Sequence, residues 1–165
     1  MLELFRHYFV KKKEAFPIHY IILGGIAALI PDLDILAYYI LSSFGFSLTE
    51  VHRTFSHTLF IPALFVILGF SVYGFKSKKL GVRHLKLRNI FFVIAFGILT
   101  HLLLDATLAG SIMPFYPVSE YALGMNLISY LPEIIQPSFL PSLDALLLII
   151  WLVSLEFRHN ISRLL

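Results

Sequence analysis

The stretch IFFVIAFGILTHLLLDATLA, residues 90–109, decides the fold class of this chain. It supplies the roughly 20 apolar residues with which an α-helix crosses a hydrocarbon core about 30 Å thick. Three further stretches resemble it, at residues 18–44, 58–75 and 139–157. The 165 residues are 58% hydrophobic and only 14% charged, unlike those of soluble domains. We expect an all-α polytopic membrane helix bundle with about four spanning helices, forming a single domain over residues 1–165.

The basic residues predict how these spans are oriented. They gather before the first span, between the second and third, and after the fourth: Arg6, Lys11, Lys12 and Lys13; Lys76, Lys78, Lys79, Arg83, Lys86 and Arg88; Arg158 and Arg163. The positive-inside rule therefore predicts a multi-pass cell-membrane protein with both termini in the cytoplasm. No cleavable signal peptide is expected, because the first apolar run is too long. This pattern disfavours a nucleic-acid partner, although the basic link 76–88 could dock a protein or anionic headgroups.

The first span carries a proline and two acids in its middle. Pro31 removes a backbone hydrogen-bond donor, which favours a break in the helix. Asp32 and Asp34 follow it, and carboxylates this close repel each other unless a cation lies nearby. We expect a polar cavity at the break, with a capping or turn role for the two acids as the alternative.

The segment between the third and fourth spans is too apolar for an ordinary solvated loop. It mixes aromatic residues with prolines and has no Lys or Arg. We expect an interfacial segment on the outer surface, with a short helix near residues 119–131. Its aromatic residues form either a membrane-interface belt or a lid.

His101 and Asp105 are the only ionisable residues of the third span. At i and i+4 they share one face of a helix. Ionisable residues within spans are costly and usually face a cavity that has a function. A hydrogen bond that joins two helices is the simpler alternative.

The segment HRTFSHTLF, residues 52–60, adds polar residues directly before the second span. A capping box at residues 47–50 predicts a helix that begins there and carries them. On such a helix Arg53 and His57 share a face, whereas His52 lies about 140° from His57. We favour His57 as a metal ligand and His52 as a second-metal ligand or a base. Arg53 would hold an anionic group such as phosphate, or anchor the chain to headgroups.

On this topology the acids at the break, the histidines before the second span and the pair in the third span lie at one depth. Imidazole and carboxylate together favour zinc, with manganese or iron as alternatives, and the absence of cysteine excludes thiolate ligands. His19 is different, because a straight helix would put it about 20 Å from Asp32. Geometry alone leaves His19 near the cytoplasmic face.

Four pieces of the chain, in this order and spacing, resemble the YdjM-like family of inner-membrane metal-dependent hydrolases. They are IHYIILGG, IPDLDIL, HRTFSHTLF and THLLLDATLAGSIMPFYPVS, within residues 17–119. The resemblance implies metal ligation by the matching positions His19, Asp32, Asp34, His52, His57, His101 and Asp105. The order is also distantly similar to part of the zinc-dependent phospholipase C pattern. That family's further H-x-x-x-E element has no counterpart after Asp105, so we expect one or two metal ions.

The combined prediction is a membrane-embedded metal-dependent hydrolase acting on a phosphoester or related bond of a lipid or lipid-linked substrate at the outer side. His57, His101, Asp105 and one of Asp32 and Asp34 would bind metal. The other carboxylate or His52 would take the proton from water, and Arg53 would clamp the anionic group. The alternatives are a non-enzymatic metal carrier and a regulatory scaffold that docks a partner through residues 76–88. Substrate, metal identity and oligomeric state stay open at this stage.

Overall fold

The computed structural model describes residues 2–10, 16–47, 51, 55–72 and 85–159. These residues form helices and no β-strand, which confirms the all-α prediction. In chain order the helices are α1 (Leu2–Phe9), α2 (Ile18–Ala27), the 3-10 helix η2 (Pro31–Leu33), α3 (Asp34–Leu41), the 3-10 helix η3 (Ser42–Phe44), α5 (Phe60–Ser71), α6 (Leu87–Leu104), the π-helix η4 (Asp105–Ala109), the 3-10 helix η5 (Leu127–Tyr130) and α7 (Gln136–His159).

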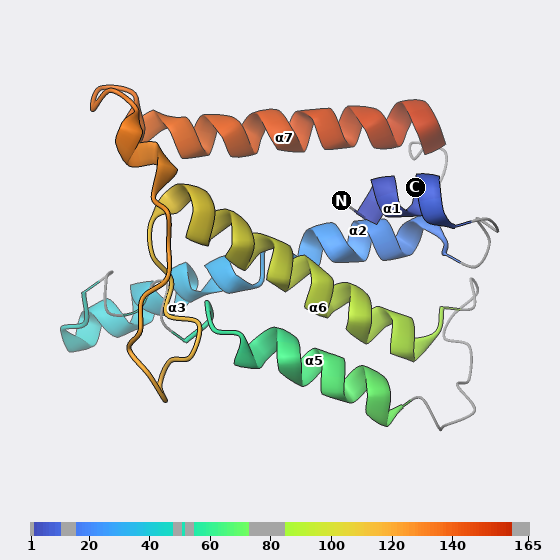
Figure 1. Cartoon of the computed structure of the whole chain (residues 1–165), viewed down its shortest axis with the longest axis horizontal. Helices are drawn as coiled ribbons and strands as arrows, with labels where there is room; N and C mark the ends of the chain where they lie inside the picture. Colours follow the sequence, from blue (N-terminus) through green and yellow to red (C-terminus); the bar gives the residue numbers. More distant parts are fainter. Residues whose placement is uncertain (1, 11–15, 48–50, 52–54, 73–84, 160–165) are drawn as a thin grey trace.

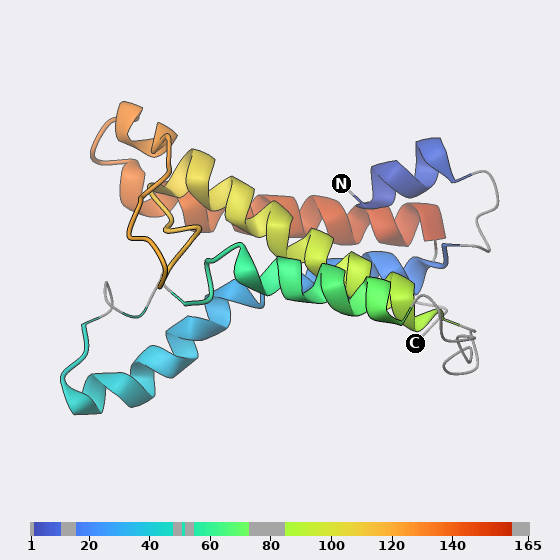
Figure 2. The same ribbon diagram turned by 60° about the horizontal axis from the view of Figure 1, so that its bottom comes forward.

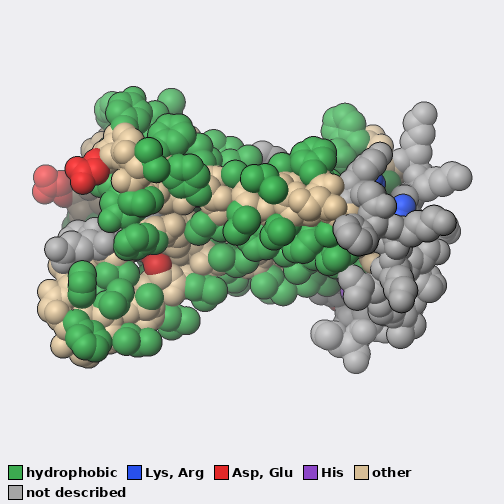
Figure 3. All heavy atoms as spheres, turned by 90° about the horizontal axis from the view of Figure 1, so that it is seen from below, with side chains coloured by type: hydrophobic (Ala, Val, Ile, Leu, Met, Phe, Trp, Pro, Cys, Tyr) green, Lys and Arg blue, Asp and Glu red, His purple; other side chains and the backbone are tan. Residues whose placement is uncertain are grey.

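Helix α6 is the centre of the bundle and packs against both α5 and α2 (Figures 1 and 2). Helix α1, the first turn of α6 and the last turn of α7 lie at one end, and α3 and residues 110–135 lie at the other. The basic end thus includes Arg6, Arg88 and Arg158. Figure 3 shows hydrophobic side chains over the middle, with the visible Lys and Arg at one end and most of the visible Asp and Glu at the other.

Two helices are long and apolar enough to cross a membrane, namely Leu87–Ala109 and Gln136–Arg158. A third span exists if α2 and the segment Pro31–Phe44, which are bent by 42°, count as one. Helix α5 has 12 residues and is therefore about 18 Å long, short of a full crossing. The described residues therefore contain two or three candidate spans, where we expected about four.

The first span is broken at Pro31, as predicted. Helix α2 ends at Ala27, and its last carbonyls enter tight turns, with the Ile30 N–H donating to Ala27 O at 3.1 Å. Because Pro31 has no N–H, the α-helical hydrogen-bond ladder cannot continue through it. The chain restarts as η2 and α3, and this places Asp32, in η2, beside α6.

Small residues let α2 and α6 approach each other closely. A Cβ atom on Gly97 would lie 2.5 Å from the carbonyl oxygen of Gly24 and 3.0 Å from Cβ of Ala27. Such small-residue contacts are a common means of joining helices in membranes. Next to them, Ile98 and Leu102 are fully buried in a core cluster that continues to Ala106 and Ile112.

The segment after α6 folds back over the end of that helix. Ile112 and Leu123 exchange two backbone hydrogen bonds of 2.9 Å, and the Met125 N–H donates to Ala106 O at 2.7 Å. The short helix expected near residues 119–131 is η5, Leu127–Tyr130. The segment therefore lies over η4, the π-helix that begins at Asp105.

Candidate metal centre

His57 lies in a tight turn that precedes α5. Residues 55–59 form turns, so the expectation that a helix carries His57 is wrong. Tertiary contacts to the segment after α6 hold this turn: the Leu59 N–H donates to Pro114 O at 2.8 Å, and Phe55 packs edge-on against Tyr116 with ring centroids 5.0 Å apart. The His57 side chain is consequently fully buried.

Asp32, His57 and His101 come together from three separate segments. One ligand atom from each lies within 4.8 Å of the others, which is close enough for all three to bind one metal ion. Oδ1 of Asp32 is 3.4 Å from Nε2 of His101 and 3.8 Å from Nε2 of His57. The two imidazole rings lie close together, with centroids 5.4 Å apart.

Asp105 adjoins this group from the end of α6. Its Oδ2 lies 3.2 Å from Nε2 of His57 and 3.9 Å from Nε2 of His101, its i, i+4 neighbour. At Asp105 the α-helix widens into the π-helix η4, a local form that is frequent at functional sites. Gly110 ends this turn with φ of 131°, which favours glycine.

Asp34 lies on the other side of the His57 ring. Its Oδ2 is 3.3 Å from Nδ1 of His57. The Ser56 hydroxyl donates to the same carboxylate oxygen at 2.6 Å and lies 2.9 Å from Nδ1. A carboxylate on one imidazole nitrogen orients the other nitrogen towards a metal. Asp34 therefore positions His57, with Nε2 directed at Asp32 and Asp105.

The chemistry of these groups fits a divalent cation. Nε2 of His101 is buried and makes no hydrogen bond within the described part of the chain, although a carboxylate oxygen lies 3.4 Å away. Asp32 and Asp105 approach the same imidazole nitrogens, and a cation between them relieves their mutual repulsion. Two imidazoles with carboxylate oxygens form a donor set that suits zinc.

Among the described residues, the predicted ligand His19 is not part of the group. His19 lies in the first turn of α2, with about 12 Å of helix between it and the break, so the bend does not carry it towards Asp32. His52 and Arg53 lie outside the described residues, as does most of the basic link 76–88.

Asp144 is a candidate site residue that the sequence interpretation missed. It lies on α7 and lines a cavity of about 450 Å³ together with Asp32, His101 and Asp105, and it interacts electrostatically with all three. Most of the remaining lining is leucine. The signal was present in the sequence, because an acid within an apolar span indicates a functional site by the same reasoning that selected Asp105.

Comparison with known proteins identifies one family. A sequence model described as YdjM inner membrane protein matches residues 4–160. No match was found among curated proteins or among solved structures. The family description names a location and no reaction, and together with the apolar helices it assigns the protein to the membrane. As the four sequence pieces predicted, the chain belongs to the YdjM inner membrane protein family.

Proposed function

We propose that the protein is a membrane-embedded hydrolase that uses a divalent metal, with zinc favoured, to cleave a phosphoester or related bond of a lipid or lipid-linked substrate. The observation that carries this proposal is the position of the group Asp32, His57 and His101, beside a leucine-lined cavity of about 450 Å³. Three protein ligands beside an open cavity are typical of catalytic zinc sites, whereas structural sites are closed by four. An apolar cavity with a few convergent polar groups is typical of a substrate site.

Each residue of the candidate metal centre has a role in this proposal. Asp32, His57 and His101 would hold the ion, and Asp34 with Ser56 would keep Nδ1 of His57 engaged so that Nε2 stays available. A divalent cation supplies Lewis-acid polarisation of a phosphoryl oxygen and makes water acidic enough to act near neutral pH. Oδ2 of Asp105, 3.2 Å from Nε2 of His57, is the nearest further carboxylate oxygen and would accept the proton from that water.

The charge distribution supports an orientation for this enzyme. Arg6, Arg88 and Arg158 belong to α1, α6 and α7, at the end of the bundle opposite the candidate metal centre (Figure 1). By the positive-inside rule, that end would face the cytoplasm. Both termini would then be cytoplasmic, and the metal centre would lie in the outer half of the membrane.

The test measures bound metal and lipid hydrolysis in the same purified samples. Wild type is compared with His101→Ala, Asp32→Asn and the control Thr107→Ala, whose hydroxyl only donates to backbone carbonyls of the preceding turn in the structure. We expect wild type and the control to bind zinc and to release product from phospholipids or lipid-linked phosphates, and the two site variants to lose both properties.

Two results would contradict the proposal. If His101→Ala and Asp32→Asn contain as much zinc as wild type, these residues do not bind the ion and the proposed metal centre is wrong. Zinc lost on substitution, but with no turnover of any phospholipid or lipid-linked phosphate by wild type, would exclude the hydrolase and favour the metal carrier.

A further inference from the structure

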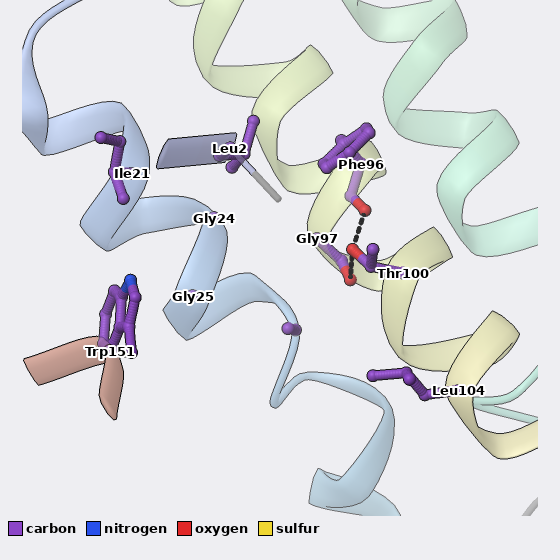
Figure 4. Close-up of a pocket in the computed structure, with 10 residues that line it drawn as sticks. Leu2, Ile21, Gly24, Gly25, Phe96, Gly97, Thr100, Leu104 and Trp151 are labelled. Atoms are coloured by element: carbon purple, nitrogen blue, oxygen red, sulfur yellow. Dashed lines mark hydrogen bonds between the residues drawn. The ribbon is translucent and has the colours of Figure 1, made fainter. Parts of the chain in front are cut away.

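Two cavities adjoin each other between α7 and the pair α2 and α6. The first, of about 450 Å³, contains the acids and His101 of the metal centre. The second, of about 290 Å³, is drawn in Figure 4, where Trp151 of α7 faces Gly25 of α2. Leu104 lines both cavities. Leu104 therefore forms a wall that the cavity of the candidate metal centre shares with a second cavity, whose lining contains no ionisable residue.

Three glycines contribute to the lining of the second cavity, namely Gly24, Gly25 and Gly97. A Cβ atom on Gly25 would lie 2.8 Å from the Trp151 ring, so the indole packs directly against α2 at this glycine. Thr100 is the one hydroxyl residue of the lining, and its hydroxyl donates to Gly97 O at 3.0 Å and also to Phe96 O (Figure 4). What this cavity offers to a ligand is therefore apolar surface, which suits hydrocarbon.

Helix α7, which lines both cavities, is largely exposed on its other side. Most hydrophobic side chains of α7 are exposed, among them Leu147, Ile149 and Leu152. The firm contact of α7 with α2 is near its end, where Leu155 is buried with Ile18 and Ile21. In a bilayer, most of α7 would therefore lie against lipid tails.

We propose that the two cavities form one groove, which binds an anionic amphiphile with its phosphoryl head at the metal centre and the end of one hydrocarbon chain beside Trp151. Asp144 and Trp151 are seven positions apart on α7, which corresponds to about 10 Å and suits an alkyl chain of medium length. The head assignment rests on the proposed function, because the metal supplies the cation that attracts it. The chain assignment rests on the lining of the second cavity alone.

The single tryptophan of the chain gives a direct readout, because Trp151 itself lines the chain site. Zinc-loaded protein in detergent is titrated with dodecyl phosphate that carries bromine on its terminal carbon, and quenching of the tryptophan fluorescence is recorded. We expect saturable quenching that unbrominated dodecyl phosphate relieves and that inorganic phosphate relieves only at far higher concentration. Removal of zinc, or His101→Ala, should raise the concentration for half-quenching by about tenfold or more, the loss of one charge-assisted contact.

Variants of the second cavity test the chain site separately from the metal centre. Gly25→Leu places a side chain where the Trp151 ring now packs, and Leu104→Phe enlarges the side chain that lines both cavities. Both should abolish saturable quenching while zinc content is retained, whereas Ile149→Ala, on the exposed side of α7, should not. Retained zinc in either variant shows that it has folded, so one folded variant is sufficient for the test.

The outcomes distinguish failure of this inference from failure of the proposed function. Quenching that does not saturate, or that persists in the folded cavity variants, would mean that Trp151 meets only bulk detergent or lipid, and would overturn the groove. In that case zinc-dependent hydrolysis could still stand. Alternatively, the concentration for half-quenching could be the same with and without zinc, and the same for brominated dodecanol. That result would overturn the assignment of the head to the metal centre, and the groove would no longer support the proposed function.

Discussion

The two long apolar helices, α6 and α7, have the same mean hydropathy but are packed very differently. A third of the spanning stretch of α6 is buried in the protein, against 6% for α7. Both bring a carboxylate to the same cavity, Asp105 from α6 and Asp144 from α7. The comparison teaches that hydropathy identifies a membrane helix but does not tell a helix that builds the core from one that is mostly exposed. Small residues and contacts with neighbouring segments make that distinction.

The largest expected difference between the two helices concerns buried side chains. Ile98 of α6 is fully buried among Leu102, Ala106 and Ile112. Ile98→Ala should lower the free energy of unfolding by about 2–5 kcal/mol, because it leaves a cavity in the core. Thermal unfolding in detergent, followed by circular dichroism, would measure the loss. An unchanged melting temperature would mean that α6 does not form the core described above.

The second difference concerns the two carboxylates. Asp105→Asn and Asp144→Asn remove the same charge from the same cavity, but only Asp105 has an oxygen within 4 Å of the imidazole nitrogens, at 3.2 and 3.9 Å. We expect Asp105→Asn to weaken zinc affinity by about 10–100-fold, as changes next to metal ligands do, and Asp144→Asn to weaken it less. Competition with a zinc chelator measures both affinities. Equal losses would place Asp144 as close to the ion as Asp105.

The smallest effect is expected on the outer face of α7. Ile149 is 59% exposed and would face lipid tails, which are as apolar as the side chain they contact. Ile149→Ala should therefore change the free energy of unfolding by less than about 0.5 kcal/mol, within the range of surface substitutions. The same melting experiment serves as the measurement. A loss comparable with that of Ile98→Ala would show that another surface covers this face of α7.

Local features of the sequence predicted much of the candidate centre. The missing N–H of Pro31 favoured a break at that position, and the spacing of His101 and Asp105 places both on one helix face. The turn that carries His57 could not be predicted in this way, because Leu59 is held by Pro114, more than fifty positions later in the chain. The number of full spans also depended on packing, since α5 begins only at Phe60, after that turn. Asp144 was readable in principle, but only the fold shows that α7 lies beside the break in the first span.

The loose attachment of α7 also has a consequence for how the protein is made. The three candidate ligands Asp32, His57 and His101 all precede α7 in the chain, and so does the segment that folds back over η4. Chains are synthesised from the amino terminus, and parts made first can fold first. The ribosome therefore delivers these three residues, with the segment that folds back over η4, before it delivers α7. In the proposed enzyme, metal loading and the docking of α7 would then be separable steps in the biogenesis of the protein.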